Sequence, residues 1–152
     1  MTIPKTCRSF TISIASDALA VRDALGEVTR RLAQLGLATD DIATVELVTA
    51  EVLNNIVEHA YSDEPGNIIR LCCNQKSDGL HITFEDIGKR MPEGDAPNAT
   101  SANADAEFDD LPEGGFGWFL IHELTSDLTY RRQRDRNLLS MCLPTPHTVR
   151  RE

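Results

Sequence analysis

The chain has 152 residues, of which 41% are hydrophobic and 26% are charged, and these values predict a single globular domain over 1–152. No apolar run approaches the ~20 residues that cross a bilayer, and the N-terminal segment has no signal-peptide core, so we expect a cytoplasmic protein with no membrane partner. The net charge of −9, from 15 basic and 24 acidic residues, argues against direct binding of nucleic acid.

The first half of the chain predicts one strand followed by two helices. Residues 9–14 alternate between polar and apolar side chains, as a half-buried strand does. Apolar residues then recur every three or four positions behind a serine or aspartate cap, which predicts a helix over 17–36. A second helix is expected from Thr39, or the aspartate after it, to about Tyr61, because "DEPG" at 63–66 breaks the pattern.

The second half predicts two hairpins that flank a long loop and a third helix. Residues 67–75 and 80–86 are expected strands joined by "KSDG". The stretch 89–113 is rich in small, acidic and proline residues, which is typical of a functional lid or a disordered segment, and we interpret it as a lid. A glycine cluster then opens a helix. The last expected segments are strands over 128–133 and 136–144, a basic strand end or turn at 131–136, and a frayed tail over 147–152.

This order of elements, β-α-α-β-β-lid-α-β-β, favours an α+β two-layer sandwich over a doubly wound parallel fold. The chain contains four cysteines, Cys7, Cys72, Cys73 and Cys142, at positions that fit no metal-ligand spacing. Cys72 and Cys73 are adjacent and would point to opposite faces of a strand. We expect all four cysteines to be reduced and partly buried thiols.

The second predicted helix carries a narrow polar line in "AEVLNNIVEHAY", residues 50–61. Glu51, Asn55 and Glu58 fall within one sector of roughly 60°, with His59 at its edge, beside a broad apolar face. A carboxylate one turn before a carboxamide can accept a proton from a nucleophile while the amide oxygen ligates Mg²⁺. On the helix alone, it is equally plausible that both glutamates face water and that Asn55 is a surface amide.

Two motifs farther along the chain suggest a phosphate-bearing ligand. In "EGGFG", Gly114, Gly115 and Gly117 remove side chains where a helix begins, so backbone N–H groups can meet a polyanion; a simple hinge explains the first two glycines as well. In "FEDIG", Asp86 can accept a hydrogen bond from an exocyclic amine such as that of adenine, and Gly88 lets a flat ligand approach. Taken alone, such an aspartate–glycine pair is more often a turn.

The combination of "E-x-x-x-N", "DIG", a long loop and "GGFGWFLI" resembles the nucleotide-binding boxes of the GHKL ATPase superfamily. The layout is most similar to its anti-sigma-factor serine kinase branch, whose typical phrase "SELVTNAVEHAY" is here "TAEVLNNIVEHAY", and the likeness covers nearly the whole chain. The resemblance implies a Bergerat-type ATP-binding fold, a two-layer α/β sandwich with a mixed, mostly antiparallel sheet and helices on one face. It implies ATP and Mg²⁺ as cofactors.

The resemblance also implies roles for individual residues on the second helix and at the end of the strand expected over 80–86. Glu51 matches the general base of the family and Asn55 its Mg²⁺ ligand. His59 matches a histidine that lies near the phosphates. Asp86 matches the aspartate that binds adenine, with Gly88 beside it.

The remaining matches are in the glycine loop and the last hairpin, and some positions depart from the family pattern. A late threonine near the adenine would be Thr129 or Thr125. The segment "DIGKR" lacks the second glycine of many relatives, and Met91 replaces an aromatic residue, which affects the expected behaviour of the lid. The loop that closes over the phosphates would consist of Gly114, Gly115, Phe116 and Gly117.

The function that the resemblance implies is a serine-protein kinase that is also an anti-sigma factor. It would phosphorylate a serine of a STAS-domain anti-sigma antagonist, sequester a sigma factor and form a homodimer. Two alternatives remain: a nucleotide-dependent binding clamp without phosphotransfer, and a kinase of another signalling complex. An intact Glu51 favours transfer, because a clamp needs Asn55 and the glycines but no base.

Overall fold

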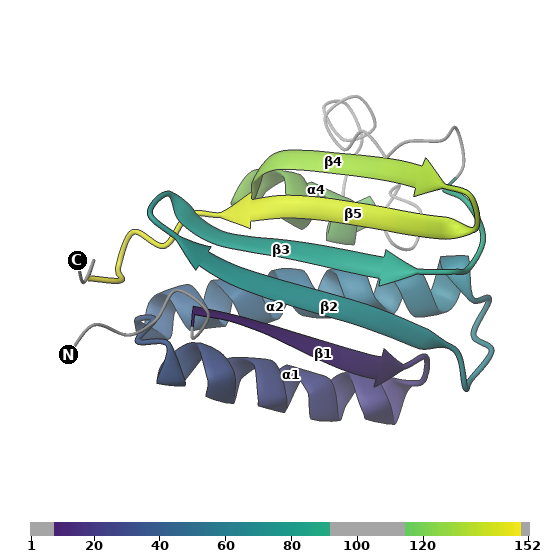
Figure 1. Cartoon of the computed structure of the whole chain (residues 1–152), viewed down its shortest axis with the longest axis horizontal. Helices are drawn as coiled ribbons and strands as arrows, with labels where there is room; N and C mark the ends of the chain where they lie inside the picture. Colours follow the sequence, from purple (N-terminus) through teal and green to yellow (C-terminus); the bar gives the residue numbers. More distant parts are fainter. Residues whose placement is uncertain (1–7, 92–114, 150–152) are drawn as a thin grey trace.

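The computed structural model describes residues 8–91 and 115–149 (Figure 1). Every strand and helix expected from the sequence is present, with bounds that differ by a few residues. Residues 92–113 of the expected lid, together with Gly114, lie outside the described residues. Within the described ranges, no helix is both long and apolar enough to cross a membrane. The elements are β1 (Ser9–Ala15), α1 (Ala18–Gln34), α2 (Thr39–Asn55), η2 (Ile56–Ala60), β2 (Ile68–Lys76), β3 (Gly79–Asp86), α4 (Gly115–Leu124), β4 (Ser126–Gln133) and β5 (Arg136–Leu143).

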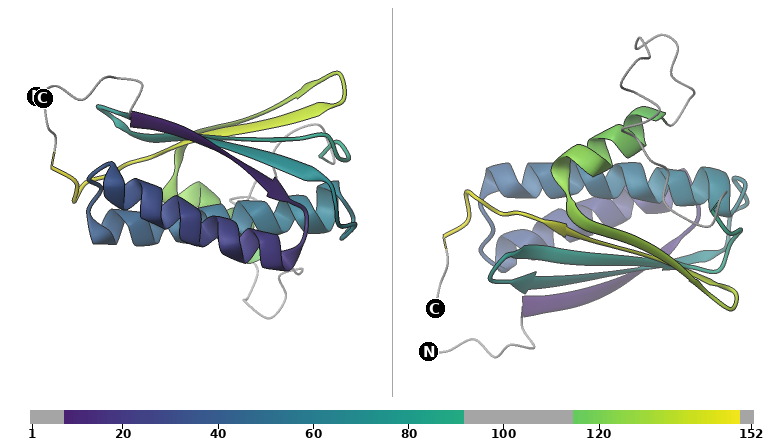
Figure 2. Two further views of the ribbon diagram at one scale, coloured as in Figure 1. Left: turned by 60° about the horizontal axis from the view of Figure 1, so that its bottom comes forward. Right: turned by 90° about the horizontal axis from the view of Figure 1, so that it is seen from above.

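The strands form one five-stranded sheet in the order β1-β2-β3-β5-β4. Its helices α1, α2 and α4 all lie on the same face, which gives two layers (Figure 2). The predicted α+β sandwich is therefore confirmed. Each pairing between the described strands is antiparallel, so this part of the chain contains none of the parallel pairs that a mixed sheet would have.

The core lies between the sheet and the helices and follows directly from the sequence periodicities. Alternate residues of the central strands are buried, as Leu80, Ile82 and Phe84 are in β3, whereas the residues between them lie on the uncovered face. Helix α1 buries the side chains at its three-to-four spacing, including Val28 and Leu32. Two faces of the sheet thus have distinct roles: one packs the core and the other is open.

The long second helix of the sequence prediction consists of two parts. Helix α2 ends at Asn55 and continues as a single π-helical turn, η2, up to Ala60. Tyr61 then ends the helix, and Ser62 and Asp63 turn the chain through positive φ angles of 51° and 61°. Single π-turns inside helices are frequent at functional sites, and this one begins directly after the polar residue Asn55.

The C-terminal segment differs from the sequence prediction. Asp41 is buried, and its carboxylate accepts hydrogen bonds from the backbone N–H of His147 (3.1 Å) and from the hydroxyl of Thr148. The same hydroxyl accepts the backbone N–H of Ala38 at 3.0 Å. The expected frayed tail over 147–152 is therefore wrong at its first two residues, because a buried carboxylate at the start of α2 binds them; 150–152 lie outside the described residues.

Candidate functional site

The polar line on α2 is partly enclosed. Asn55 is 8% exposed, and its Nδ2 atom is buried without a hydrogen-bond partner among the described residues. A buried amide N–H₂ without a partner costs free energy, so Nδ2 calls for an acceptor from outside the described residues. Glu51 lies one turn before Asn55 and is half-buried.

The first turn of α4 packs against this line. A Cβ atom placed on Gly117 would lie 2.5 Å from Oε2 of Glu51 and 3.6 Å from Nδ2 of Asn55. Glycine thus lets the helix backbone approach these two side chains closely, and a larger residue would displace the Glu51 carboxylate. The sequence predicted a polar line and a glycine-rich helix start as separate motifs, and the fold brings them together. Gly115 and Phe116 begin α4, and the side chain of Phe116 lies outside the described part of the structure.

Asp86 ends β3 on the core-facing side of the sheet and is 5% exposed. Its Oδ1 atom accepts hydrogen bonds from the backbone N–H of Gly88 at 2.9 Å and from Nδ2 of Asn137 at 2.7 Å. Burial raises the pKa of Asp86, and these two hydrogen bonds oppose the rise. Both bonds from the described residues go to Oδ1, which leaves Oδ2 to accept a hydrogen bond from a ligand.

Gly88 is required for a reason that the sequence did not indicate. A Cβ atom at this position would collide with the backbone carbonyl of Ala60, the last residue of η2. The next residue, Lys89, donates its N–H to the same carbonyl at 2.8 Å. The D-x-G turn is thus docked on the end of the helix that carries Glu51 and Asn55, so the three predicted segments meet along one helix.

Sequence reasoning missed the residue that holds this turn, Asn137. Its side chain is 4% exposed, and Nδ2 donates to the carbonyl of Lys89 at 2.9 Å as well as to Asp86. Its Oδ1 accepts the hydroxyl of Tyr130 and, at 3.0 Å, the guanidinium of Arg132. The signal was available: Asn137 occupies a core-facing position in the alternation of β5, where a polar side chain needs a partner.

The expected adenine-side threonine is not Thr129. Thr129 pairs with Ser140 and is exposed on the open face of the sheet, whereas Asp86 and its cross-strand partner Asn137 lie on the core-facing side. Strand periodicity separates these faces, so Thr129 cannot contact Asp86. The alternative, Thr125, donates its hydroxyl to the carbonyl of Ile121 at 2.6 Å.

His59 lies in η2, one turn beyond Asn55. Its side chain is 63% exposed and approaches Oε2 of Glu58 at 3.9 Å. The histidine is thus exposed to solvent, whereas the sequence placed it at the edge of the polar line towards the apolar face. Its expected place beside phosphates remains a prediction. The exposed Glu58 agrees with a solvated role for that carboxylate.

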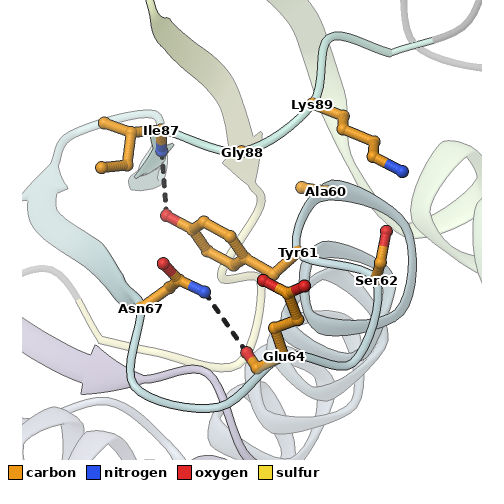
Figure 3. Close-up of a pocket in the computed structure, with 8 residues that line it drawn as sticks. All are labelled: Ala60, Tyr61, Ser62, Glu64, Asn67, Ile87, Gly88 and Lys89. Atoms are coloured by element: carbon orange, nitrogen blue, oxygen red, sulfur yellow. Dashed lines mark hydrogen bonds between the residues drawn. The ribbon is translucent and has the colours of Figure 1, made fainter.

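A cleft of about 460 Å³ lies between the D-x-G turn and the segment that joins η2 to β2, beside the contact of Ala60 with Gly88 (Figure 3). Tyr61 forms one wall: its hydroxyl donates to the carbonyl of Ile68 at 2.7 Å and accepts the N–H of Ile87 at 2.9 Å. Burial raises the pKa of Tyr61, so this hydroxyl stays protonated. Glu51, Asn55 and Asp86 do not line the cleft, which is therefore separate from the polar line.

Comparison with known proteins identifies the family. Residues 14–143 match the family described as the histidine kinase-like ATPase domain. The chain belongs to this family. The match includes the polar line, the D-x-G turn and the start of α4, so all three segments of the candidate site lie within the histidine kinase-like ATPase domain.

Individual relatives of this histidine kinase-like ATPase domain include bacterial serine-protein kinases. The chain is 32% identical to serine-protein kinase RsbW of Staphylococcus epidermidis over 101 residues, which is 64% of this chain and 63% of that protein. It is 33% identical to serine-protein kinase RsbW of Halalkalibacterium halodurans over 93 residues, 60% of this chain and 56% of that one. The chain thus spans less than two thirds of the length of these relatives.

A solved structure supports the fold. The crystal structure of the RsbU and RsbW domains of a Mycobacterium tuberculosis protein superposes with a TM-score of 0.61 at 18% identity, covering 94% of this chain and 34% of that one. At this level of identity the similarity concerns the fold alone. The predicted superfamily and its two-layer architecture are confirmed.

Proposed function

We propose that this protein is an ATP-dependent serine-protein kinase and anti-sigma factor. The observation that carries the proposal is the packing of Gly117 against Glu51 and Asn55, with a buried Asn55 amide that has no partner among the described residues. This places the start of a helix, a carboxylate and an unsatisfied carboxamide at one point. Similarity to serine-protein kinase RsbW supports the same reaction class.

The residues present fit ATP with Mg²⁺. Asn55 would hold the cation through its amide oxygen, since oxygen ligands suit Mg²⁺. Its buried Nδ2, which has no partner among the described residues, would donate to an acceptor such as a phosphate oxygen. Backbone N–H groups at the start of α4, with Gly114, Gly115 and Gly117, would contact the phosphates. The Oδ2 atom of Asp86 would accept a hydrogen bond from the exocyclic amine of adenine. When bound, Mg²⁺·ATP supplies the phosphoryl group and neutralises its charge.

Glu51 would act on the acceptor. Its carboxylate would orient or deprotonate a serine hydroxyl of the protein substrate, while the rigid scaffold of α2 and α4 holds the reacting groups in place. The substrate that we propose is a STAS-domain anti-sigma antagonist, and the second partner is a sigma factor held by a homodimer of this chain. Both partners rest on the resemblance to anti-sigma-factor serine kinases.

The test is phosphotransfer from γ-labelled ATP to STAS-domain proteins encoded by the same genome. The wild type should transfer label to one antagonist, and Glu51→Ala should lose about 100-fold or more of that rate while still binding ATP. Thr129→Ala is the matched control, since Thr129 is exposed on the opposite face of the sheet. Transfer that survives Glu51→Ala would overturn the assigned base.

Two other outcomes separate the alternatives. ATP binding with no transfer to any antagonist would identify a nucleotide-dependent clamp. Transfer to an antagonist without binding of a sigma factor would identify a kinase of another signalling complex. Glu51, packed against Gly117 at the start of α4, favours phosphotransfer over a binding clamp and over a purely structural role for the polar line.

A further inference from the structure

Three potential metal ligands converge at the far end of β3. Asp78 lies in the turn before β3, His81 lies in β3, and Cys142 lies in β5 as the direct cross-strand partner of His81. Nε2 of His81 is 2.7 Å from Oδ1 of Asp78, and the ligand atoms of all three residues lie within 4.8 Å of one another. Each residue belongs to a type that commonly binds zinc.

The backbone beneath this cluster is closely packed. Gly79 has a φ of +142°, and a Cβ atom there would collide with the carbonyl of Leu143 and lie 3.2 Å from Sγ of Cys142. The sulfur in turn lies 3.8 Å from the carbonyl of Asp78. The turn is therefore held directly over Cys142, which limits the movement needed to bring three ligand atoms to one ion.

Burial changes in steps across the cluster. Cys142 is 3% exposed, the His81 side chain is 32% exposed and the Asp78 side chain is 61% exposed. The sulfur is thus at the inner end and the carboxylate at the solvent end. An ion could enter past Asp78, and water could complete its coordination on that side.

We propose that Asp78, His81 and Cys142 bind one zinc ion, with water in the fourth position. Ligand atoms around tetrahedral zinc are roughly 3.3–3.8 Å apart, so the 4.8 Å limit requires a rearrangement of about 1 Å, which the exposed Asp78 side chain can supply. A thiolate, an imidazole and a carboxylate select zinc over the hard ion Mg²⁺. Binding releases the thiol proton, and the His81 proton moves from Nε2 to Nδ1.

This site is distinct from the proposed nucleotide site. His81 precedes Asp86 by five positions on β3, roughly 17 Å along the strand, and the two side chains lie on opposite faces of the sheet. Around the thiol, the carboxylate of Asp127 and the ammonium of Lys76 bring opposite charges, and the Ser126 hydroxyl hydrogen-bonds the sulfur. A bound ion would join the β2–β3 turn to the last strand and stabilise the sheet.

Cobalt is a suitable probe because a thiolate ligand gives Co²⁺ an intense charge-transfer band. The full chain, freed of metal by a chelator, should show this band on addition of Co²⁺ and lose it on addition of Zn²⁺. Cys142→Ser should abolish the band. Cys72→Ser should retain the band, because Cys72 lies on the same open face but is not one of the three proposed ligands. Its sulfur accepts a hydrogen bond from the hydroxyl of Thr11 instead.

His81→Ala should weaken Zn²⁺ binding by at least 10- to 100-fold, and its thermal melting in the absence of metal shows whether the variant folds. ATP affinity should be unchanged in Cys142→Ser, which separates this site from the nucleotide site. Absence of the cobalt band, a band that depends on Cys72, or Zn²⁺ binding that is unchanged in His81→Ala would each overturn the proposal.

Discussion

Nδ2 of Asn137 donates a 2.7 Å hydrogen bond to Oδ1 of Asp86, its direct cross-strand partner. The bond joins the last hairpin to the D-x-G turn at a point where both side chains are buried. Together with the N–H of Gly88 it satisfies Oδ1 of a buried carboxylate, and it leaves Oδ2 to accept a hydrogen bond from a ligand. The position of Asp86 therefore depends on a residue 51 positions away in the sequence.

Asn137→Ala should destabilise the protein. Removal of the amide leaves the carbonyl of Lys89 without this donor and leaves Asp86 with only the N–H of Gly88, at a cost of about 1–3 kcal/mol in the free energy of unfolding. Urea denaturation measures this change. Thr129→Ala, on the exposed face, should stay within about 0.5 kcal/mol of the wild type. Equal effects for the two variants would contradict the assigned network.

Asp86→Asn should separate folding from nucleotide binding. Asparagine oxygen can accept both hydrogen bonds that Oδ1 now accepts, but an N–H₂ group then replaces Oδ2 and faces the adenine amine. We expect the melting temperature without nucleotide to be equal or higher, and the stabilisation by ATP to be lost. Stabilisation by ATP equal to that of the wild type would remove Asp86 from the adenine site.

The same variant tests the pH dependence. Burial raises the pKa of folded Asp86 above its ordinary value of 3.8, so the folded chain binds more protons than the unfolded chain between these two values. Stability from this group is fully present below 3.8 and falls as pH rises through the folded pKa. The stability of Asp86→Asn relative to the wild type should therefore increase over that window, as measured by denaturation at several pH values.

Gly117→Ala should impair chemistry more than folding. The new methyl group meets the carboxylate end of Glu51, a flexible side chain that can swing away. We expect a loss of about 1 kcal/mol or less in stability, and a loss of about 100-fold in phosphotransfer because the base is displaced. A variant with wild-type transfer would show that the position of Glu51 is not catalytic.

Gly88→Ala should impair folding itself. Its methyl group meets the backbone carbonyl of Ala60, which cannot move without shifting the end of η2, and a loss of about 1–3 kcal/mol is expected. Gly26→Ala is the matched control: it lies in α1 with open space around it and should gain about 0.5–1 kcal/mol. Thermal melting of the two variants would show opposite shifts.

Cys73 should resist alkylation in the folded protein. It is 1% exposed, and burial, with a smaller contribution from Cys72, raises its pKa to about 12. The reactive thiolate is therefore scarce at neutral pH. Mass spectrometry after iodoacetamide treatment should find Cys72, which is half-buried on the open face, modified before Cys73. Cys73 should react only once the chain unfolds.

Much of the site was predictable because it depends on local patterns. Glu51 and Asn55 form a polar line beside a broad apolar face of their helix, and Asp86 and Gly88 lie at the end of a strand whose alternation is clear. Helix and strand periods also indicate which side chains face the core, and so the two-layer arrangement. The partner of a distant residue carries no such signature: the alternation of β5 marks Asn137 as core-facing but does not reveal that it bonds Asp86.

The sequence by itself determined the order of the elements, the polar line on the second helix and the family resemblance, since periodicity, caps and motif spacing are properties of neighbouring residues. Tertiary structure alone decided that Asn137 holds Asp86, that Gly88 docks on Ala60, and that Cys142 lies opposite His81. The physical reason is strand register: pairing between strands sets which distant residues meet, and a period of two residues sets the face on which they meet.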